Sequence, residues 1–205
     1  MRPNMTGNEN PNMVVRRATL SDVEEMHQLI NHFAGLGLML PKPLSKLYQN
    51  IRDFFVAEKD GQFAGCAALH VIWKDLGEIR SLAVAEPYQK NGVGRRLAVA
   101  ALQDATDLKL PRVFALTYQQ EFFEYLGFVE AEKSTMPQKV WGECMDCPKF
   151  PNCDEVALIL DAPFLSPDGD LWSRAERERS SGEAALAKAG RAQVGRRRAR
   201  RARTG

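Results

Sequence analysis

The chain of 205 residues has no apolar run that approaches the roughly 20 residues needed to span a bilayer, so its sequence predicts no transmembrane helix. The first 13 residues are rich in Asn and Pro and lack the apolar segment of a secretory signal. Cysteine is scarce, at four residues, and without an export signal these thiols are expected to stay reduced and to serve chemistry or metal binding. We therefore expect a cytoplasmic protein that does not enter membranes.

The net charge of +2 hides an uneven distribution. Residues 1–172 contain 17 Lys and Arg against 23 Asp and Glu, whereas residues 173–205 contain 11 against 3. An acidic globular part argues against a basic surface that steers toward nucleic acid. The Arg-rich residues 173–205 are predicted to form a disordered tail. Such a tail could contact nucleic acid or an acidic membrane, but we favour a solubilising or incidental extension.

Hydrophobic residues make up 44% of the chain, enough for the core of a folded domain. We expect a flexible leader at 1–13, one folded domain at 14–165 and the tail at 173–205. Turn residues and spacing predict strands at 14–17, 54–57, 63–73, 78–85, 113–116, 128–129 and 156–160. They predict helices at 23–33, 44–52, 92–109 and 121–125, the first preceded by a capping box of Ser21 and Glu24. This order is typical of an α+β, or mixed α/β, domain.

A glycine-containing loop separates the strand that ends near Val84 from the long helix that follows. It reads Gln89-x-x-Gly92-x-Gly94, so backbone amides can crowd around an anion at a helix start that itself attracts negative charge. Lys90, Arg95 and Arg96 add positive charge. The pattern predicts a pyrophosphate site, with a purely geometric turn as the alternative. The third glycine of the dinucleotide fingerprint is missing, which argues against a nicotinamide site.

Two motifs at the expected separation resemble a known superfamily. The Gln89 loop resembles the acetyl-CoA signature of the GCN5-related N-acetyltransferase (GNAT) superfamily, and Phe122 to Phe128 resembles its second signature. The match covers roughly residues 14–160. It implies the GNAT fold, a central and mostly antiparallel sheet flanked by helices, with acetyl-CoA as co-substrate and no metal required for chemistry. The implied cofactor-binding residues are Leu82, Ala83, Val84, Gln89, Lys90, Asn91, Gly92, Val93, Gly94, Arg95 and Phe123.

Within that superfamily the chain is similar to the short, stand-alone N-acetylglutamate synthases of bacterial arginine biosynthesis. Residues 35–41, 51–58, 65–69 and 77–84 carry this similarity. It implies transfer of acetyl from acetyl-CoA to the α-amine of L-glutamate. About a dozen residues precede the first expected strand, so we expect no arginine-sensing kinase-like domain. The expected partners are these small molecules, and a homodimer is left open.

The acceptor ammonium must lose a proton before it can attack a thioester, and a carboxylate at the mouth of the site can take that proton. Glu78 is the candidate base, by its position and because a matching glutamate serves the related synthases; a solvated glutamate beside a turn is the alternative. Backbone amides from Leu82 to Val84 are expected to hold the oxyanion. We expect direct attack, with Cys66 a core residue rather than an acyl carrier.

The proton donor to the leaving thiolate has several candidates in the sequence. The second signature usually supplies a tyrosine, but this chain has Phe123 at that position. Thr117, Tyr118 or Tyr125 are the alternative donors, as is water.

A substrate with two carboxylates predicts a cationic pocket. Strand alternation places Arg80 on the same face as Glu78, together with Leu82 and Val84, and it places Ile79, Ser81 and Ala83 on the other face. The guanidinium of Arg80 could hold one carboxylate. Lys42 and Arg52 are candidates for the other carboxylate. Each of these cations could instead be a surface charge. Glutamine, a polyamine or a protein amine remain alternative acceptors, and a non-catalytic module that binds acyl-CoA or nucleic acid remains an alternative of another class.

Three cysteines, Cys144, Cys147 and Cys153, fall within ten residues. The Cys-x-x-Cys spacing is typical of a metal knuckle, but a closed zinc site needs four ligands, and Asp146, Asp154 or Cys66 would have to complete it. We favour reduced or redox-active thiols over a structural metal. Purified protein is therefore expected to contain well below one equivalent of zinc.

Overall fold

The structure is a computed structural model that describes residues 12–136, 144–147, 149–166 and 168–171. The described residues up to Asp170 belong to one compact unit. Most of the predicted leader and the whole predicted tail lie outside the described residues, as does the side chain of Asp146. No helix in the part of the chain that is described has the length and apolar character needed to cross a membrane.

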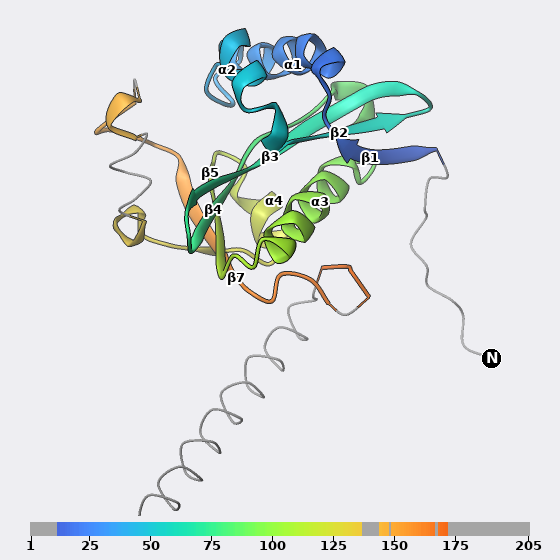
Figure 1. Cartoon of the computed structure of the whole chain (residues 1–205). Coiled ribbons are helices and arrows are strands. Elements are labelled where there is room, and N and C mark those ends of the chain that lie inside the picture. Colours follow the sequence, from blue (N-terminus) through green and yellow to red (C-terminus); the bar gives the residue numbers. More distant parts are fainter. Residues whose placement is uncertain (1–11, 137–143, 148, 167, 172–205) are drawn as a thin grey trace, which may run out of the picture. The chain divides into compact units, whose positions relative to one another are not determined.

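The core of the fold is a seven-stranded mixed sheet in the order β1-β2-β3-β4-β5-β7-β6 (Figure 1). Neighbouring strands are antiparallel except for β4 and β5, which are parallel. The sheet confirms the predicted α+β class and the mostly antiparallel arrangement. The strands are β1 (Met13–Arg17), β2 (Phe54–Lys59), β3 (Gln62–Trp73), β4 (Leu76–Val84), β5 (Arg112–Thr117), β6 (Val129–Glu130) and β7 (Val156–Asp161).

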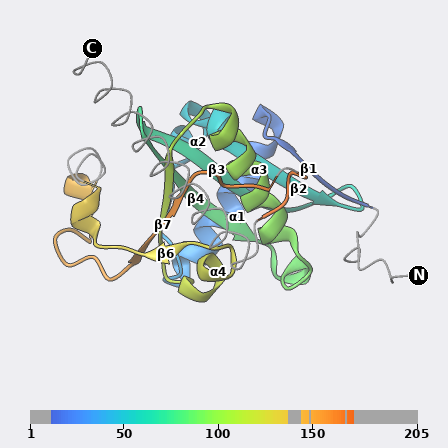
Figure 2. The same cartoon turned by 90° about the horizontal axis from the view of Figure 1, so that it is seen from below.

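Helices cover both faces of the sheet (Figures 1 and 2). Helices α1 (Val23–Gly35) and α2 (Leu44–Gln49) lie on one face, and α3 (Val93–Asp107) packs on β1 to β4 from the other, while α4 (Gln120–Tyr125) contacts β7. The apolar face of α1 is completely buried at Val23, Met26 and Ile30, which follow the spacing of three and four residues that an amphipathic helix requires. The long α3 is the crossover that parallel pairing of β4 with β5 demands.

The capping box predicted before α1 is wrong in its residues. The box lies two residues earlier, where Asp22 Oδ2 accepts hydrogen bonds from the amide of Thr19 at 2.7 Å and from its hydroxyl at 2.8 Å. Arg16 donates to both carboxylate oxygens of Asp22 at 2.8 Å, which fixes that carboxylate in place. A short 3-10 turn (Leu20–Asp22) therefore precedes α1, and Ser21 and Glu24 do not cap it.

Strict alternation along β4 also fails, at Ser81. This residue has a φ of 54°, and the pairing with β3 shifts there, so that Arg80 faces Ala68 whereas Ala83 faces Cys66. Since Cys66 and Ala68 share one face of β3, Ala83 shares the face of Arg80, contrary to the prediction. The cause is a β-bulge, in which an extra residue reverses the phase of the side chains that follow.

Candidate functional site

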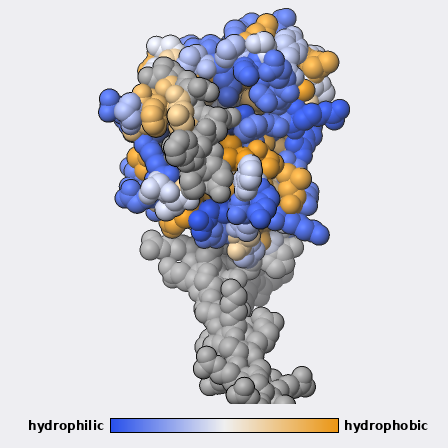
Figure 3. Space-filling model, turned by 60° about the vertical axis from the view of Figure 1, so that its left-hand side comes forward, coloured by the Kyte–Doolittle hydropathy of each residue, from blue (hydrophilic) through white to orange (hydrophobic). Residues whose placement is uncertain are grey.

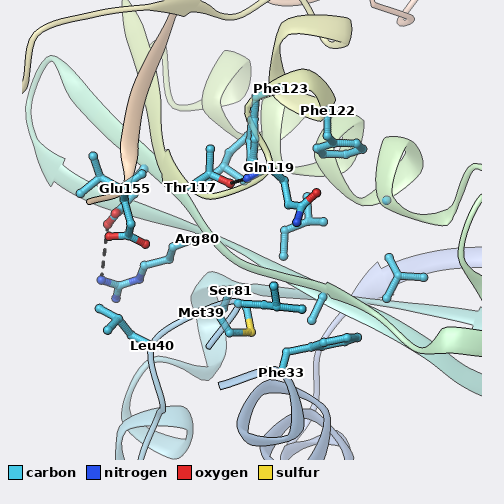
Figure 4. Close-up of a pocket in the computed structure, with 18 of the residues that line it drawn as sticks. Phe33, Met39, Leu40, Arg80, Ser81, Thr117, Gln119, Phe122, Phe123 and Glu155 are labelled. Atoms are coloured by element: carbon cyan, nitrogen blue, oxygen red, sulfur yellow. Dashed lines mark hydrogen bonds and ion pairs between the residues drawn. The ribbon is translucent and has the colours of Figure 1, made fainter. Parts of the chain in front are cut away.

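A cavity of about 970 Å³ opens along β4. Its wall comes from the loop between α1 and α2, from all of β4 after Glu78, from the loop before α3, from the end of β5 with α4, and from the segment 144–155. Hydrophobic surface is visible in the middle of one face of the molecule, between hydrophilic residues (Figure 3). Among the labelled residues, Phe33 and Met39 approach β4 from the side of α1, and Phe122 and Phe123 of α4 approach it from the opposite side (Figure 4).

The cavity exists because β4 and β5 separate. Their parallel pairing covers only Gly77 with Val113 and Glu78 with Phe114. Beyond Glu78, β4 continues to Val84 without registered pairing to β5, and the bulge at Ser81 turns its backbone. At about 3.3 Å per residue, this stretch of β4 spans roughly 20 Å. The cavity therefore has two ends, which we call the carboxylate end, at Glu78, Arg80 and Glu155, and the loop end, at residues 89–95.

The loop end is formed by the predicted glycine loop. The side-chain amide of Gln89 donates to the carbonyl of Val84 at 3.0 Å, which ties the loop to the end of β4. Gly92 caps α3 with a φ of 80°, a left-handed conformation that other residues rarely adopt. A Cβ on Gly94 would lie 3.3 Å from the ring of Phe122, so the helix start packs tightly against α4.

The charges at the start of α3 are the reverse of what the helix dipole favours. Its first turn has no acidic residue but contains Arg95 and Arg96. Arg95 lines the cavity and forms an ion pair with Asp170. The guanidinium of Arg96 instead donates to the carbonyl of Met13 at 3.2 Å, so this side chain binds the edge strand β1. Lys90 also lines the cavity. Backbone amides and these cations make the loop end suited to a polyanion.

The carboxylate end holds buried charges. Glu78 is only 4% exposed, and its Oε2 lies 3.7 Å from the Nη1 of Arg80. Glu155, which immediately precedes β7, points into the same end (Figure 4). Burial raises the pKa of Glu155, and the nearby charge of Glu78 raises it further. The thiol of Cys153 lies 3.6 Å from Glu155 Oε2. Two carboxylates and one guanidinium thus meet in a partly desolvated space.

Behind Glu78 lies a histidine that the sequence analysis did not select. His70 on β3 is directly opposite Glu78 on β4, so the two side chains leave the sheet on the same face. Its Nδ1 is 2.5 Å from Asp53 Oδ2, which fixes the imidazole ring. Asp53 precedes β2 and His70 lies on β3, 17 positions later, so no local sequence pattern predicts that they pair.

Most of the predicted site residues line the cavity, but three do not. Lys42, Thr117 and the exposed Tyr125 belong to its wall, together with the residues predicted on β4 and the loop. Asn91 and Arg52 lie outside the wall; Arg52 is exposed in the turn before β2. Tyr118 also lies outside, because its hydroxyl is held by Lys149 and donates to Asp154 at 2.7 Å.

Phe123 fills the position at which a tyrosine was expected. It is buried, and its ring packs edge-on against Phe122 and Phe128, with centroids 5.3 Å apart in each pair. It reaches the cavity wall with an apolar ring and has no proton to give. Thr117, whose hydroxyl accepts the amide of Gln119 at 2.9 Å, is the nearby hydroxyl on β5.

The four cysteines divide into one buried and three partly exposed thiols. Cys66 is completely buried, and burial raises the pKa of its thiol to about 12, which removes it as a nucleophile. Cys144, Cys147 and Cys153 all line the cavity. Within the described ranges, no group of three His, Cys, Asp or Glu side chains is placed to hold a metal ion. Of the proposed further ligands, Asp154 pairs with Lys149 at 2.9 Å instead.

Glu155 is the functional candidate that the sequence analysis missed. The sequence signal for Glu155 was its position directly before the predicted strand 156–160. Because β7 pairs with β5, the beginning of β7 lies at the side of β4 that β5 leaves unpaired. The apolar wall from Phe33, Met39 and Leu40 was also missed. Phe33 lies on α1, where helical spacing indicates only a buried face, and Met39 and Leu40 lie in the loop after α1, which carries no periodicity that assigns side chains to a site.

Comparison with known proteins agrees with this geometry. The profile of the acetyltransferase (GNAT) family matches residues 23–128. An amino-acid acetyltransferase from Mycobacterium tuberculosis is 41% identical over 158 residues, which is 76% of this chain and 88% of the relative. An uncharacterized N-acetyltransferase from Chlorobaculum tepidum is 40% identical over 145 residues, 71% of this chain and 94% of the relative.

Two solved structures show the same fold. A Mycobacterium tuberculosis protein in complex with CoA and NLQ superposes with a TM-score of 0.64 at 36% identity, covering 72% of this chain and 98% of that one. N-acetylglutamate synthase from Neisseria gonorrhoeae, complexed with coenzyme A and N-acetyl-glutamate, superposes with a TM-score of 0.67 at 28% identity, covering 73% of this chain and 35% of that one. The chain belongs to the acetyltransferase (GNAT) family and is an acetyl-CoA-dependent N-acetyltransferase.

Proposed function

We propose that the protein transfers the acetyl group of acetyl-CoA to the α-amine of L-glutamate. The observation that carries this proposal is the carboxylate end of the cavity, where the buried Glu78 and the partly buried Arg80 lie 3.7 Å apart. One side chain can accept a proton from an ammonium, and the other can bind a carboxylate. The names of the relatives, amino-acid acetyltransferase and N-acetylglutamate synthase, support an amino-acid acceptor.

The coenzyme lies along β4 in this proposal. Amides and cations of the loop end, from Gln89 to Arg95, hold its diphosphate, and the pantetheine follows the unpaired side of β4 toward Glu78. Gly92 and Gly94 allow the backbone to approach closely. Asn91 is in the loop but outside the cavity wall, so its side chain contributes little.

Glu78 acts as the general base. It takes a proton from the α-ammonium, directly or through water, and the amine then attacks the thioester carbonyl to form a carbon–nitrogen bond. The backbone amides of Leu82 to Val84 stabilise the oxyanion in this proposal, which is supported by the absence of registered pairing between this stretch of β4 and β5. Breakage of the carbon–sulfur bond releases the coenzyme as a thiolate, and loss of the second ammonium proton to water leaves the N-acetylated amino acid.

Water supplies the proton to the leaving thiolate. Phe123 carries no hydroxyl, and Tyr118 is held outside the cavity by Lys149 and Asp154. A thiolate of ordinary basicity, with a pKa near 8.5, is a stable enough leaving group to depart before it is protonated. Thr117 contributes a polar contact at the wall.

Glutamine is a second candidate acceptor, favoured by a different observation. Glu78 and Glu155 both face the carboxylate end, so an acceptor with a neutral side chain avoids repulsion that a second carboxylate would meet. Arg80 and Lys42 favour glutamate by attraction.

The test is release of free coenzyme thiol from acetyl-CoA against L-glutamate, L-glutamine, a polyamine and a lysine peptide. We expect kcat/KM to be highest with glutamate, and mass spectrometry of the product should show acetyl on the α-amine. Higher kcat/KM with glutamine would assign the second acceptor. Release only with the polyamine or the peptide would overturn an amino-acid acceptor.

A further inference from the structure

Cys144 and Cys147 lie on one tight turn in the cavity wall. The 3-10 turn (Cys144–Asp146) closes with a hydrogen bond from the amide of Cys147 to the carbonyl of Cys144, at 3.1 Å. A turn closed in this way keeps its first and fourth Cα atoms within about 7 Å. Disulfides join Cα atoms about 4.4–6.8 Å apart. The backbone therefore already has the spacing that a bond between these two sulfurs requires.

The surroundings favour thiol chemistry over metal binding. Both side chains are partly exposed to the cavity, so a small oxidant can reach them. In the described part of the chain they do not join a third ligand in a metal-holding group. Cys153 is placed differently, because its thiol is directed at the Glu155 carboxylate, 3.6 Å away. Cys66 is completely buried with a pKa raised to about 12, which protects it from oxidation.

We propose that Cys144 and Cys147 form a redox dithiol that a peroxide converts to an intramolecular disulfide. One thiolate attacks a peroxide oxygen, the oxygen–oxygen bond breaks, and a sulfenic acid and water form. The second thiol then attacks the sulfenic sulfur, which forms the sulfur–sulfur bond and releases a second water. Both sulfurs are oxidised and the peroxide is reduced; a dithiol reductant reverses the step by exchange.

The disulfide changes the wall of the acceptor site. Segment 144–155 also contributes Phe150, Cys153 and Glu155 to the cavity, whereas the loop end comes from other elements. Oxidation should therefore change the KM for the acceptor and leave coenzyme binding unaltered. This consequence rests on the proposed function, but the formation of the disulfide does not.

The experiment treats the full-length protein with graded hydrogen peroxide, then counts free thiols after denaturation and maps the cross-link by mass spectrometry. We expect loss of two of the four thiols, with one peptide containing Cys144 and Cys147 lighter by two hydrogens, and recovery with dithiothreitol. Cys153→Ser, which keeps both partners of the bond, is the matched control and should still lose two of its remaining three thiols reversibly. Cys144→Ser and Cys147→Ser should each abolish the reversible loss of a thiol pair.

Three outcomes would overturn the proposal: a disulfide that requires Cys153, a mixed disulfide with added coenzyme A in place of the internal bond, or stoichiometric zinc that occupies both thiols. Thiol counts and turnover are measured separately on each sample. If the disulfide forms but the protein does not acetylate glutamate, the proposed dithiol stands and the proposed substrate is wrong. If glutamate is acetylated but no disulfide forms, the proposed substrate stands and the proposed dithiol is wrong.

Discussion

The two ends of the cavity are built by different means. At the loop end, the proposed binding is mainly by the backbone, since a helix start and a left-handed Gly92 are suited to present amides to an anion. At the carboxylate end, Glu78 and Arg80 come from β4 and Glu155 from the position just before β7, and all three are partly or fully buried. The loop end uses residues close in sequence. The carboxylate end uses residues as far as 77 positions apart in the sequence, from Glu78 to Glu155.

We infer from this difference that the loop end recognises the diphosphate of the coenzyme, whereas the carboxylate end recognises the particular acceptor. A backbone cradle binds any chain-like diphosphate and tolerates most changes of side chain. Buried charged side chains bind one arrangement of charges, and removal of one partner leaves the other uncompensated. Substitutions at the carboxylate end should therefore have the larger effects and act on the acceptor, whereas those at the loop end should have smaller effects and act on the coenzyme.

Glu78→Gln should have the largest effect. Without a proton acceptor the ammonium stays protonated, so kcat should fall by about 10²–10⁴-fold while the Kd for acetyl-CoA stays unchanged. Steady-state kinetics and calorimetry measure the two quantities. Glu24→Gln, an exposed change on α1, is the control and should leave both as in the wild type. A Glu78→Gln variant with normal kcat would remove the assignment of the base.

Arg80→Gln should act next most strongly, on the acceptor. Loss of a charged hydrogen bond of about 1.5–3 kcal/mol should raise the KM for glutamate by roughly 10–100-fold and leave coenzyme binding intact. Arg52→Gln is the matched control, because Arg52 is exposed and lies outside the cavity wall. An equal rise of KM in both variants would show that general charge, rather than the geometry at Arg80, attracts the acceptor.

Gly92→Ala should have a moderate effect confined to the coenzyme. The left-handed conformation costs a non-glycine residue about 1–2 kcal/mol, which corresponds to roughly 5–30-fold weaker binding if the loop relaxes to avoid that strain. Gly61→Ala is the control. It provides the same backbone change at a φ of 74° in the turn between β2 and β3, and Gly61 is not among the residues that line the cavity. Calorimetry with CoA should show weaker binding for Gly92→Ala alone.

The sequence was informative where function depends on local structure. The Gln89 to Gly94 loop and the adjoining α3 were predicted because glycine spacing and helix periodicity act over a few residues. The sheet order could not be predicted in the same way. In particular, the insertion of β7 between β5 and β6 depends on contacts between distant segments.

Failures of prediction share a physical cause, which is tertiary structure that overrides a local rule. Alternation misplaced Ala83 because a bulge at Ser81 adds one residue to β4. Glu155 was missed because its role depends on the pairing of β7 with β5, and Tyr118 was proposed as a donor although Lys149 and Asp154 hold its hydroxyl. The carboxylate end, built from distant segments, was accordingly the less predictable of the two.

Glu155→Gln should give the smallest effect and sharpen the contrast in burial between the two ends. Burial and the Glu78 charge raise the pKa of Glu155 above its ordinary value of 4.5, so the folded state keeps a proton that the unfolded state has lost. Stability must then fall as the pH rises from that value through the raised pKa, because the folded state binds more protons in this window. Glutamine does not titrate, so the variant should lose less stability over the same pH range. Denaturant unfolding at several pH values measures the difference. An identical pH dependence in variant and wild type would mean that Glu155 is solvated and that the carboxylate end is more open than its geometry indicates.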